Sequence, residues 1–142
     1  MATTIANEVV QVFALTESGA ATYSNPSGAF EPMPATAIKM KLKFPSLLVI
    51  TFCARGAVMP SGGSSIPFVF IKCEIDGSPC EPNANSIQFL YPQVCCDSRS
   101  FTWVVPKVKP GAHIVGITWG MGNPTMAILT QRTLVVQAAK LP

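Results

Sequence analysis

In an extended chain, the residues of segment 38–44 divide into an apolar face and a lysine face. The apolar positions are Ile38, Met40, Leu42 and Phe44, and the lysine positions are Lys39, Lys41 and Lys43. A period of two with one apolar and one charged face predicts a half-buried antiparallel strand. Three like charges on one strand face are typical of a solvated surface, and they discourage edge-to-edge pairing with other chains. A site for an acidic partner is the alternative interpretation.

Two other segments have informative patterns. Residues 47–58 are apolar on both faces as far as Cys53, which indicates a strand that lies centrally in its sheet or is covered on both sides. Residues 127–138 alternate less clearly near Thr130, Gln131 and Arg132. At that point the pattern predicts a β-bulge or a bend.

Turn residues separate all the apolar runs, because 13 prolines and 10 glycines are scattered evenly along the chain. The expected strands cover residues 8–15, 38–44, 47–58, 68–75, 87–91, 101–105, 113–119 and 127–138. This pattern predicts an all-β, double-sheet jelly-roll sandwich of about 8–10 antiparallel strands. The long connection 16–37 suits a chain that crosses between sheets. An immunoglobulin-type sandwich is less favoured, because Trp103 and Trp119 follow every cysteine and the Cys–Trp–Cys order is missing.

Composition limits the classes of function. The 142 residues suffice for a single domain spanning 1–142. Hydrophobic residues make up 49% and charged residues 12% of the chain, against a typical charged share of about 25%, so the chain is not a disordered one. The net charge is +3 and no run of basic residues occurs. Nucleic-acid binding is therefore not expected, because it needs clustered lysine and arginine.

Two segments concern membranes and location. Residues 110–131 contain no Asp, Glu, Lys or Arg, and a stretch of that length could span a bilayer. Its prolines and glycines nevertheless indicate two strands and a turn. The first residues lack the basic start and the unbroken apolar stretch of a secretory signal. We therefore expect no membrane span, and a cytoplasmic or particle-associated protein.

Candidate catalytic residues are few. His113 is the single histidine and follows a Pro-Gly turn, so we interpret it as a strand-end histidine bonded to that turn. A Ser-His-Asp triad would instead bring it to Asp76 or Asp97. Glu74 and Asp76 share a strand face and could act as an acid–base pair, although a solvated hairpin end explains them as well. We expect no enzyme, cofactor or metal site; the alternative is a small hydrolase or isomerase using His113 or the Glu74/Asp76 pair.

The five cysteines lack the C-x2-C spacing that is common in zinc sites. We expect Cys53 and Cys73 to be small buried side chains, and Cys80, in a proline-rich loop, to be the most exposed thiol. Adjacent Cys95 and Cys96 are not expected to bond to each other. They would stay reduced in a cytoplasmic protein, whereas in an extracellular protein one of them could pair with Cys80.

The C-terminal third contains several loose motifs. They are FTWVV at 101–105, PGAHIV at 110–115, ITW at 117–119 and RTLVV at 132–136. This series resembles the closing strands of small bacterial and phage jelly rolls, which are similar in layout to the tumour-necrosis-factor and complement globular-head family. The resemblance implies a ten-stranded jelly roll that forms a compact homotrimer. It also implies binding of a receptor, a glycan or another partner, without catalysis.

The apolar composition also predicts self-association, because monomers rarely expose large contiguous apolar patches. The second face of strand 47–58 needs a cover. Aromatic residues exceed what one thin sandwich needs and are enriched at interfaces; they are Phe89, Tyr91, Phe101, Trp103 and Trp119. We therefore expect a non-enzymatic homo-oligomeric binding or structural module, with the resemblance favouring a trimer over a dimer. A lectin-like carbohydrate-binding head is the alternative.

Overall fold

The computed structural model describes residues 9–59, 67–82, 87–90, 97–123 and 126–142. All elements in these residues are β-strands. They are β1 Val9–Glu17, β2 Ala21–Tyr23, β3 Glu31–Leu42, β4 Ser46–Val58, β5 Phe68–Ile75, β6 Ser78–Pro79, β7 Ile87–Leu90, β8 Asp97–Val108, β9 Gly111–Gly122 and β10 Ala127–Lys140. The described residues form no helix with the length and apolar character needed to cross a membrane.

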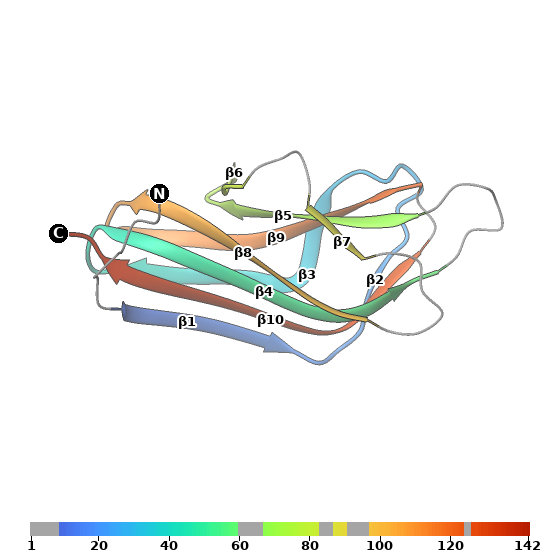
Figure 1. Ribbon diagram of the computed structural model, residues 1–142, viewed down its shortest axis with the longest axis horizontal. Coiled ribbons are helices and arrows are strands. Elements are labelled where there is room, and N and C mark those ends of the chain that lie inside the picture. Colours follow the sequence, from blue (N-terminus) through green and yellow to red (C-terminus); the bar gives the residue numbers. More distant parts are fainter. Residues whose placement is uncertain (1–8, 60–66, 83–86, 91–96, 124–125) are drawn as a thin grey trace, which may run out of the picture.

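The strands form two antiparallel sheets that pack face to face (Figure 1). The first sheet has the order β1-β10-β4-β8, and β2 also pairs with β10. The second sheet has the order β3-β9-β5-β6, and β7 also pairs with β5. The chain changes sheet between β2 and β3, β3 and β4, β4 and β5, β7 and β8, β8 and β9, and β9 and β10. This wrapping is that of a double-sheet jelly roll, so the predicted fold class is confirmed.

The alternating pattern places the lysine face and the central strand as the sequence predicted. Lys39, Lys41 and Lys43 are exposed, and β3 lies at the edge of the second sheet. Strand β4 lies between β10 and β8. Its inward residues, among them Leu48, Ile50 and Phe52, are fully buried. The predicted irregularity in β10 is confirmed by a register shift against β4.

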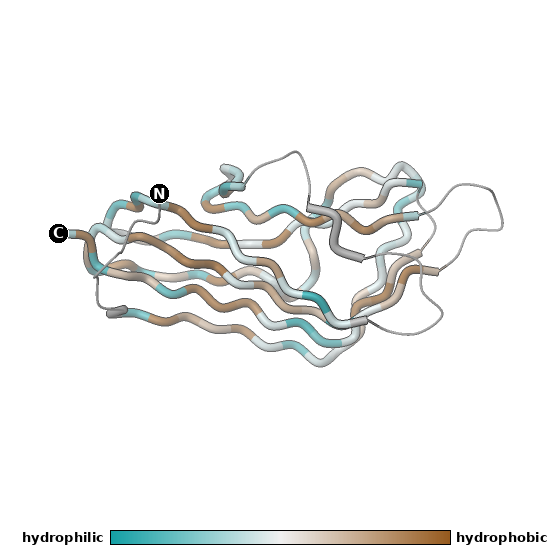
Figure 2. The backbone as a smooth tube through the Cα atoms, in the orientation of Figure 1, coloured by the Kyte–Doolittle hydropathy of each residue, from teal (hydrophilic) through white to brown (hydrophobic). Residues whose placement is uncertain are grey.

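The core fills the space between the sheets, and hydrophobic and polar residues alternate along the strands around it (Figure 2). Trp103 and Trp119 are 1% and 0% exposed. Phe101 packs edge-on against Trp103 with ring centroids 4.9 Å apart, and Tyr23 packs likewise against Trp119 at 5.5 Å. The prediction that these tryptophans serve an interface was therefore wrong, because large rings are needed to fill a gap of about 10 Å between sheets.

Of the other three aromatic residues of that prediction, Phe101 is partly buried against the core, and two are not tested. Phe89 belongs to β7, whose side chains are not described, and Tyr91 lies outside the described residues.

The segment predicted as the long loop 16–37 contains β2 and the first half of β3. Prolines are tolerated there because β3 is an edge strand. Pro32 pairs with Thr118 and Ala37 pairs with Gly116, so the residues between them bulge out of register. The hydroxyl of buried Thr36 donates to the Met33 carbonyl at 2.8 Å and holds this bulge.

One side of the sandwich is bridged by Gln11 of β1. Its side-chain Nε2 donates to the Lys41 carbonyl at 3.0 Å, and its Oε1 accepts from the Lys43 N–H at 2.9 Å. Strands β1 and β3 are edge strands of different sheets. The two hydrogen bonds therefore join the layers along this side.

Candidate functional site

The central part of the outer face of the first sheet is built from small, uncharged side chains. Outward positions are in register across its four long strands and form three rows: Thr16–Thr133–Cys53–Ser100, Ala14–Val135–Thr51–Thr102 and Val12–Gln137–Val49–Val104. We call these residues the outer-face grid. With strands about 4.8 Å apart and alternate residues about 6.8 Å apart, the grid covers roughly 400 Å².

The grid is accessible to solvent in the single chain. Val12 is 59% exposed and Val104 is 42% exposed. At the centre, the hydroxyls of Thr51 and Thr102 share a hydrogen bond of 3.1 Å. β-Branched residues suit a flat strand surface, and they leave the grid level and free of charge.

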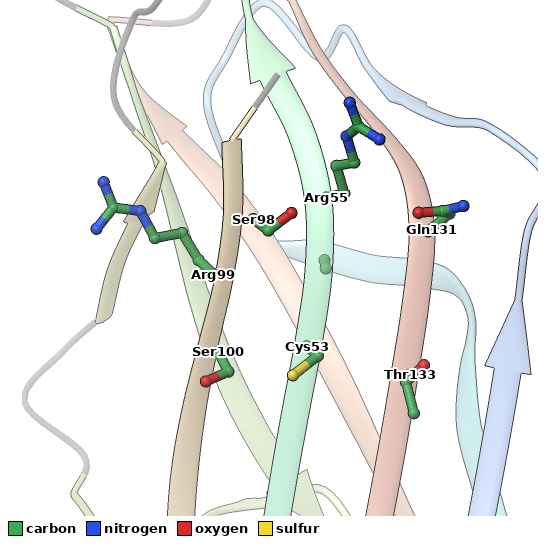
Figure 3. A pocket seen from close by; sticks show the side chains of 8 residues that line it. Cys53, Arg55, Ser98, Arg99, Ser100, Gln131 and Thr133 are labelled. Carbon is green, nitrogen blue, oxygen red and sulfur yellow. The ribbon is translucent and has the colours of Figure 1, made fainter. Parts of the chain in front are cut away.

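A shallow hollow of about 380 Å³ lies at one end of the grid, over β8, β4 and β10 (Figure 3). Cys53 lies between Ser100 and Thr133, and Arg55 and Arg99 extend in different directions beside them. Guanidinium and hydroxyl groups are suited to hold an anion or a hydroxylated ligand. A cysteine nucleophile would also need a nearby base, but the single histidine belongs to β9 of the other sheet.

His113 joins the turn before β9 to the turn after β5. Its Nε2 lies 2.8 Å from the Lys109 carbonyl, and its Nδ1 lies 2.6 Å from an Asp76 carboxylate oxygen. The other carboxylate oxygen of Asp76 accepts the Ile114 N–H at 2.8 Å. The interpretation of His113 as a strand-end residue bonded to the adjacent turn is therefore confirmed.

This arrangement leaves His113 without a nitrogen that could accept a proton. A carbonyl and a carboxylate are both acceptors, so the two contacts favour the imidazolium form, in which both ring nitrogens carry hydrogens. The hydrogen bond to Asp76 raises the pKa of His113, and the same bond, with that from Ile114, lowers the pKa of Asp76. His113 and Asp76 are in contact, as a triad would require, but the other ring nitrogen of His113 contacts the Lys109 carbonyl instead of a serine.

A second hollow, of about 260 Å³, lies on the outer face of the second sheet. Its lining includes Glu74, Asp76 and Gly116, so the two acidic residues share one surface as the sequence predicted. An acid–base pair needs one carboxyl group kept protonated by its surroundings. The hydrogen bonds of Asp76 lower its pKa, so Asp76 would be the ionised member of such a pair, and the pair itself stays a prediction.

The thiols are arranged differently from the prediction. Cys53 is exposed on the outer face of β4, whereas Cys80 is 3% exposed. Cys73 is buried, as expected. Expecting Cys53 inside and Cys80 outside was wrong, because the register of each strand decides the side on which a residue falls. Cys95 and Cys96 lie outside the described residues.

Sequence patterns gave no sign of a buried charge at Arg132, apart from the irregularity of β10 around it. The Arg132 side chain donates through Nη1 to the carbonyls of Gly19 at 2.9 Å and Leu129 at 3.2 Å. It is 4% exposed, and burial lowers its pKa. It holds the bulge of β10 from the inside. Among the described residues, no group of three or more His, Cys, Asp or Glu side chains is placed to hold a metal ion.

No protein-family model matches the chain, and no curated protein matches it in sequence. Among solved structures, dimeric latent PorU from Porphyromonas gingivalis is 11% identical with a TM-score of 0.56, over 95% of this chain and 13% of PorU. The structure of infectious bursal disease virus strain Gx gives 10% identity and a TM-score of 0.50, over 93% of this chain and 37% of that one.

The VP2 subviral particle of the same virus gives 12% identity and a TM-score of 0.49, over 92% of this chain and 37% of VP2. This chain thus spans a minor part of each of these proteins. The resemblance to tumour-necrosis-factor-like heads stays a prediction beyond the jelly-roll layout. At these identities the likeness to PorU and to the Gx strain chain concerns the fold, and it places this chain among jelly-roll β-sandwich domains.

Proposed function

We propose that the chain is a single-domain, non-enzymatic structural module that assembles with copies of itself, as a trimer, through the outer-face grid. The observation that carries this proposal is the absence of charged residues among the grid positions of all four long strands. Interface cores are depleted of charge in the same way. The exposed Val12 and Val104 give the grid apolar ends.

The area of the grid determines how much further surface a stable interface must bury. A standard interface buries about 800 Å² on each partner, so the roughly 400 Å² of the grid supplies about half. The polar residues around it, including Arg55 and Gln131 at the hollow, would form the rim. Closed symmetry is the default for such assemblies, and the trimer rests on the resemblance of the closing strands.

The comparisons support the proposal at the level of the fold. One fold neighbour is described as dimeric and another belongs to a virus structure, so this fold occurs in proteins that associate. The hydrogen bonds of His113 support a non-enzymatic function. Both ring nitrogens of this single histidine already contact oxygen acceptors, the Asp76 carboxylate and the Lys109 carbonyl.

A lectin-like head is the second candidate, supported by the hydroxyl and guanidinium groups around Cys53. Sugars usually stack on aromatic rings, and the described lining of this hollow contains none. A glycan array with reproducible binding that is lost in Arg55→Ala would replace the structural proposal by the lectin.

Light scattering at micromolar concentration tests the assembly. A mass three times 15.1 kDa supports the trimer, twice that value replaces it with a dimer, and 15.1 kDa overturns the proposal. Ala14→Glu puts a charge in the grid at an exposed position and repeats it in every copy. We expect it to raise the dissociation constant at least tenfold, since like charges at an interface cost several kcal/mol.

The matched control is Ala112→Glu, an exposed position of β9 in the other sheet. It should leave the mass unchanged. Equal effects of the two substitutions would contradict the assignment of the grid as the interface.

A further inference from the structure

The β5–β6 hairpin places two buried thiols opposite each other. Its paired residues end with Glu74 and Pro79, so Cys73 and Cys80 are the next pair in register. The N–H of Cys80 donates to the Cys73 carbonyl at 2.9 Å. The two side chains are 1% and 3% exposed, and both belong to the core between the sheets.

The pair meets the geometric requirement for a disulfide. Opposed residues that exchange backbone hydrogen bonds have Cα atoms about 5.5 Å apart, and disulfides span Cα separations of about 4.4–6.8 Å. The thiols also hydrogen-bond to each other, which raises the pKa of Cys73 and lowers the pKa of Cys80. Cys80 directly follows the exposed Ser78 and Pro79 of β6, so it is the sulfur that an oxidant reaches first.

We propose that Cys73 and Cys80 form a reversible disulfide when the chain meets a small-molecule disulfide as oxidant. The Cys80 thiolate attacks one sulfur of the oxidant, and the first small thiolate leaves. The Cys73 sulfur then attacks the Cys80 sulfur of this mixed disulfide, the S–S bond between the two cysteines forms, and the second small thiolate leaves. The two protein thiols lose two electrons and two protons, and the oxidant is reduced to two thiols.

The position of the β5–β6 hairpin explains how the oxidant reaches the thiols and what the disulfide would stabilise. Strand β6 is short, and Ser78 and Pro79 are exposed, so the hairpin end can open without loss of the main sheets. Just after Cys80, the Glu81 carbonyl accepts the N–H of Val104 in β8 at 3.1 Å. A bond between Cys73 and Cys80 would fasten this segment, which bridges the second sheet to the edge of the first.

The test uses the full chain carrying Cys53→Ser, so that no exposed thiol of β4 takes part. It is incubated with oxidised glutathione, denatured in the presence of an alkylating reagent, and cleaved with a glutamate-specific protease and chymotrypsin. Cleavage after Phe70, Glu74 and Phe89 separates Cys73, Cys80 and the Cys95–Cys96 pair into fragments 71–74, 75–89 and 90–101, whereas Glu81 precedes Pro82 and is not cut. We expect fragments 71–74 and 75–89 to be joined, and dithiothreitol to release them.

Three results would overturn the proposal: complete alkylation of Cys80, its persistence as a glutathione adduct, or its linkage to fragment 90–101. Because Cys80→Ser could disturb folding, the Cys95→Ser/Cys96→Ser double variant is the matched control and should still form the linked pair. The oxidised chain should melt about 5 °C higher than the reduced chain, as expected for a short closed loop. An unchanged Tm would refute the fastening of the bridging segment. Neither cysteine belongs to the outer-face grid, so this outcome is independent of the oligomeric state.

Discussion

Replacing Gly56 by alanine should strongly destabilise the protein, because β4 and β10 approach closely at this residue. Gly56 pairs with Leu129, next to the register shift of β10. A Cβ atom at Gly56 would lie 2.3 Å from the Ile128 carbonyl oxygen and 2.4 Å from Cδ2 of Leu129. The leucine side chain can rotate away. The carbonyl is backbone, so one of the two strands must move.

The expected magnitude follows from this contact. Overpacking of a core costs about 1–3 kcal/mol, and a clash with backbone belongs at the upper end of that range. Alanine recovers about 0.5 kcal/mol by reducing the entropy of the unfolded chain. The free energy of unfolding should therefore fall by about 2.5 kcal/mol, which lowers Tm by roughly 10 °C in a domain of this size.

Two other glycines calibrate the measurement. At Gly116 the nearest atom to a Cβ is the Thr36 carbonyl oxygen at 3.8 Å, an ordinary contact, so Gly116→Ala should be neutral or stabilise by about 0.5 kcal/mol. At Gly77 no atom lies within 4 Å but φ is +79°, so Gly77→Ala should cost about 1 kcal/mol in backbone strain.

Urea unfolding followed by tryptophan fluorescence measures all three variants, because Trp103 and Trp119 are buried. The m-values should stay equal, so that midpoints report stability directly. If Gly56→Ala were no more destabilising than Gly116→Ala, the close approach of β4 to β10 would be wrong.

Three further predictions concern single residues. His113→Ala should lower the free energy of unfolding by about 1 kcal/mol near pH 5.5, where the ion pair with Asp76 is intact. The loss should become smaller as the pH rises through the raised pKa of His113 or falls through the lowered pKa of Asp76. Urea titrations from acid to alkaline pH measure this difference, and a difference that does not change with pH would contradict the ion pair. Arg132→Ala should lower the free energy of unfolding by about 3 kcal/mol, because it leaves the Gly19 and Leu129 carbonyls unpaired and opens a cavity. Arg132→Met should lower it by less, because methionine refills the space. Equal losses of stability in thermal unfolding would argue against this packing role. Cys53 should react with a thiol reagent in the native protein while Cys73 and Cys80 stay protected, and peptide mapping after brief labelling would reveal the reverse order.

The sequence was informative wherever a local pattern decides the structure. Segment 68–75 was predicted as a strand with the bounds that β5 has, because Asp76-Gly77 ends it with a strong turn signal. The lysine face of β3 followed from a period of two. The wrapping of the two sheets could be assigned to a fold class, because many short strands joined by long and short turns have few compact solutions.

Features that depend on register between distant strands could not be predicted. The side on which Cys53 lies depends on the alignment of β4 with β8 and β10, and an error of one residue reverses it. The first half of β3 was missed because its prolines argue against a strand unless the strand is known to lie at an edge. Asp76 and His113 are 37 residues apart, and only the pairing of β5 with β9 brings them together.

The amide of Gln11 has a mechanical consequence. A primary carboxamide has the same donor and acceptor as a peptide group, and here it bonds a carbonyl and an N–H that flank Leu42, as a residue of a parallel neighbouring strand would. The Gln11 side chain thus joins the two sheets at one point, with the hydrogen bonds that a neighbouring strand would make. A force that slides β1 along β3 would load both hydrogen bonds at once. Gln11→Glu would remove the N–H donor to the Lys41 carbonyl. One hydrogen bond of the side chain would then remain between β1 and β3, and the same force would separate the two strands more easily.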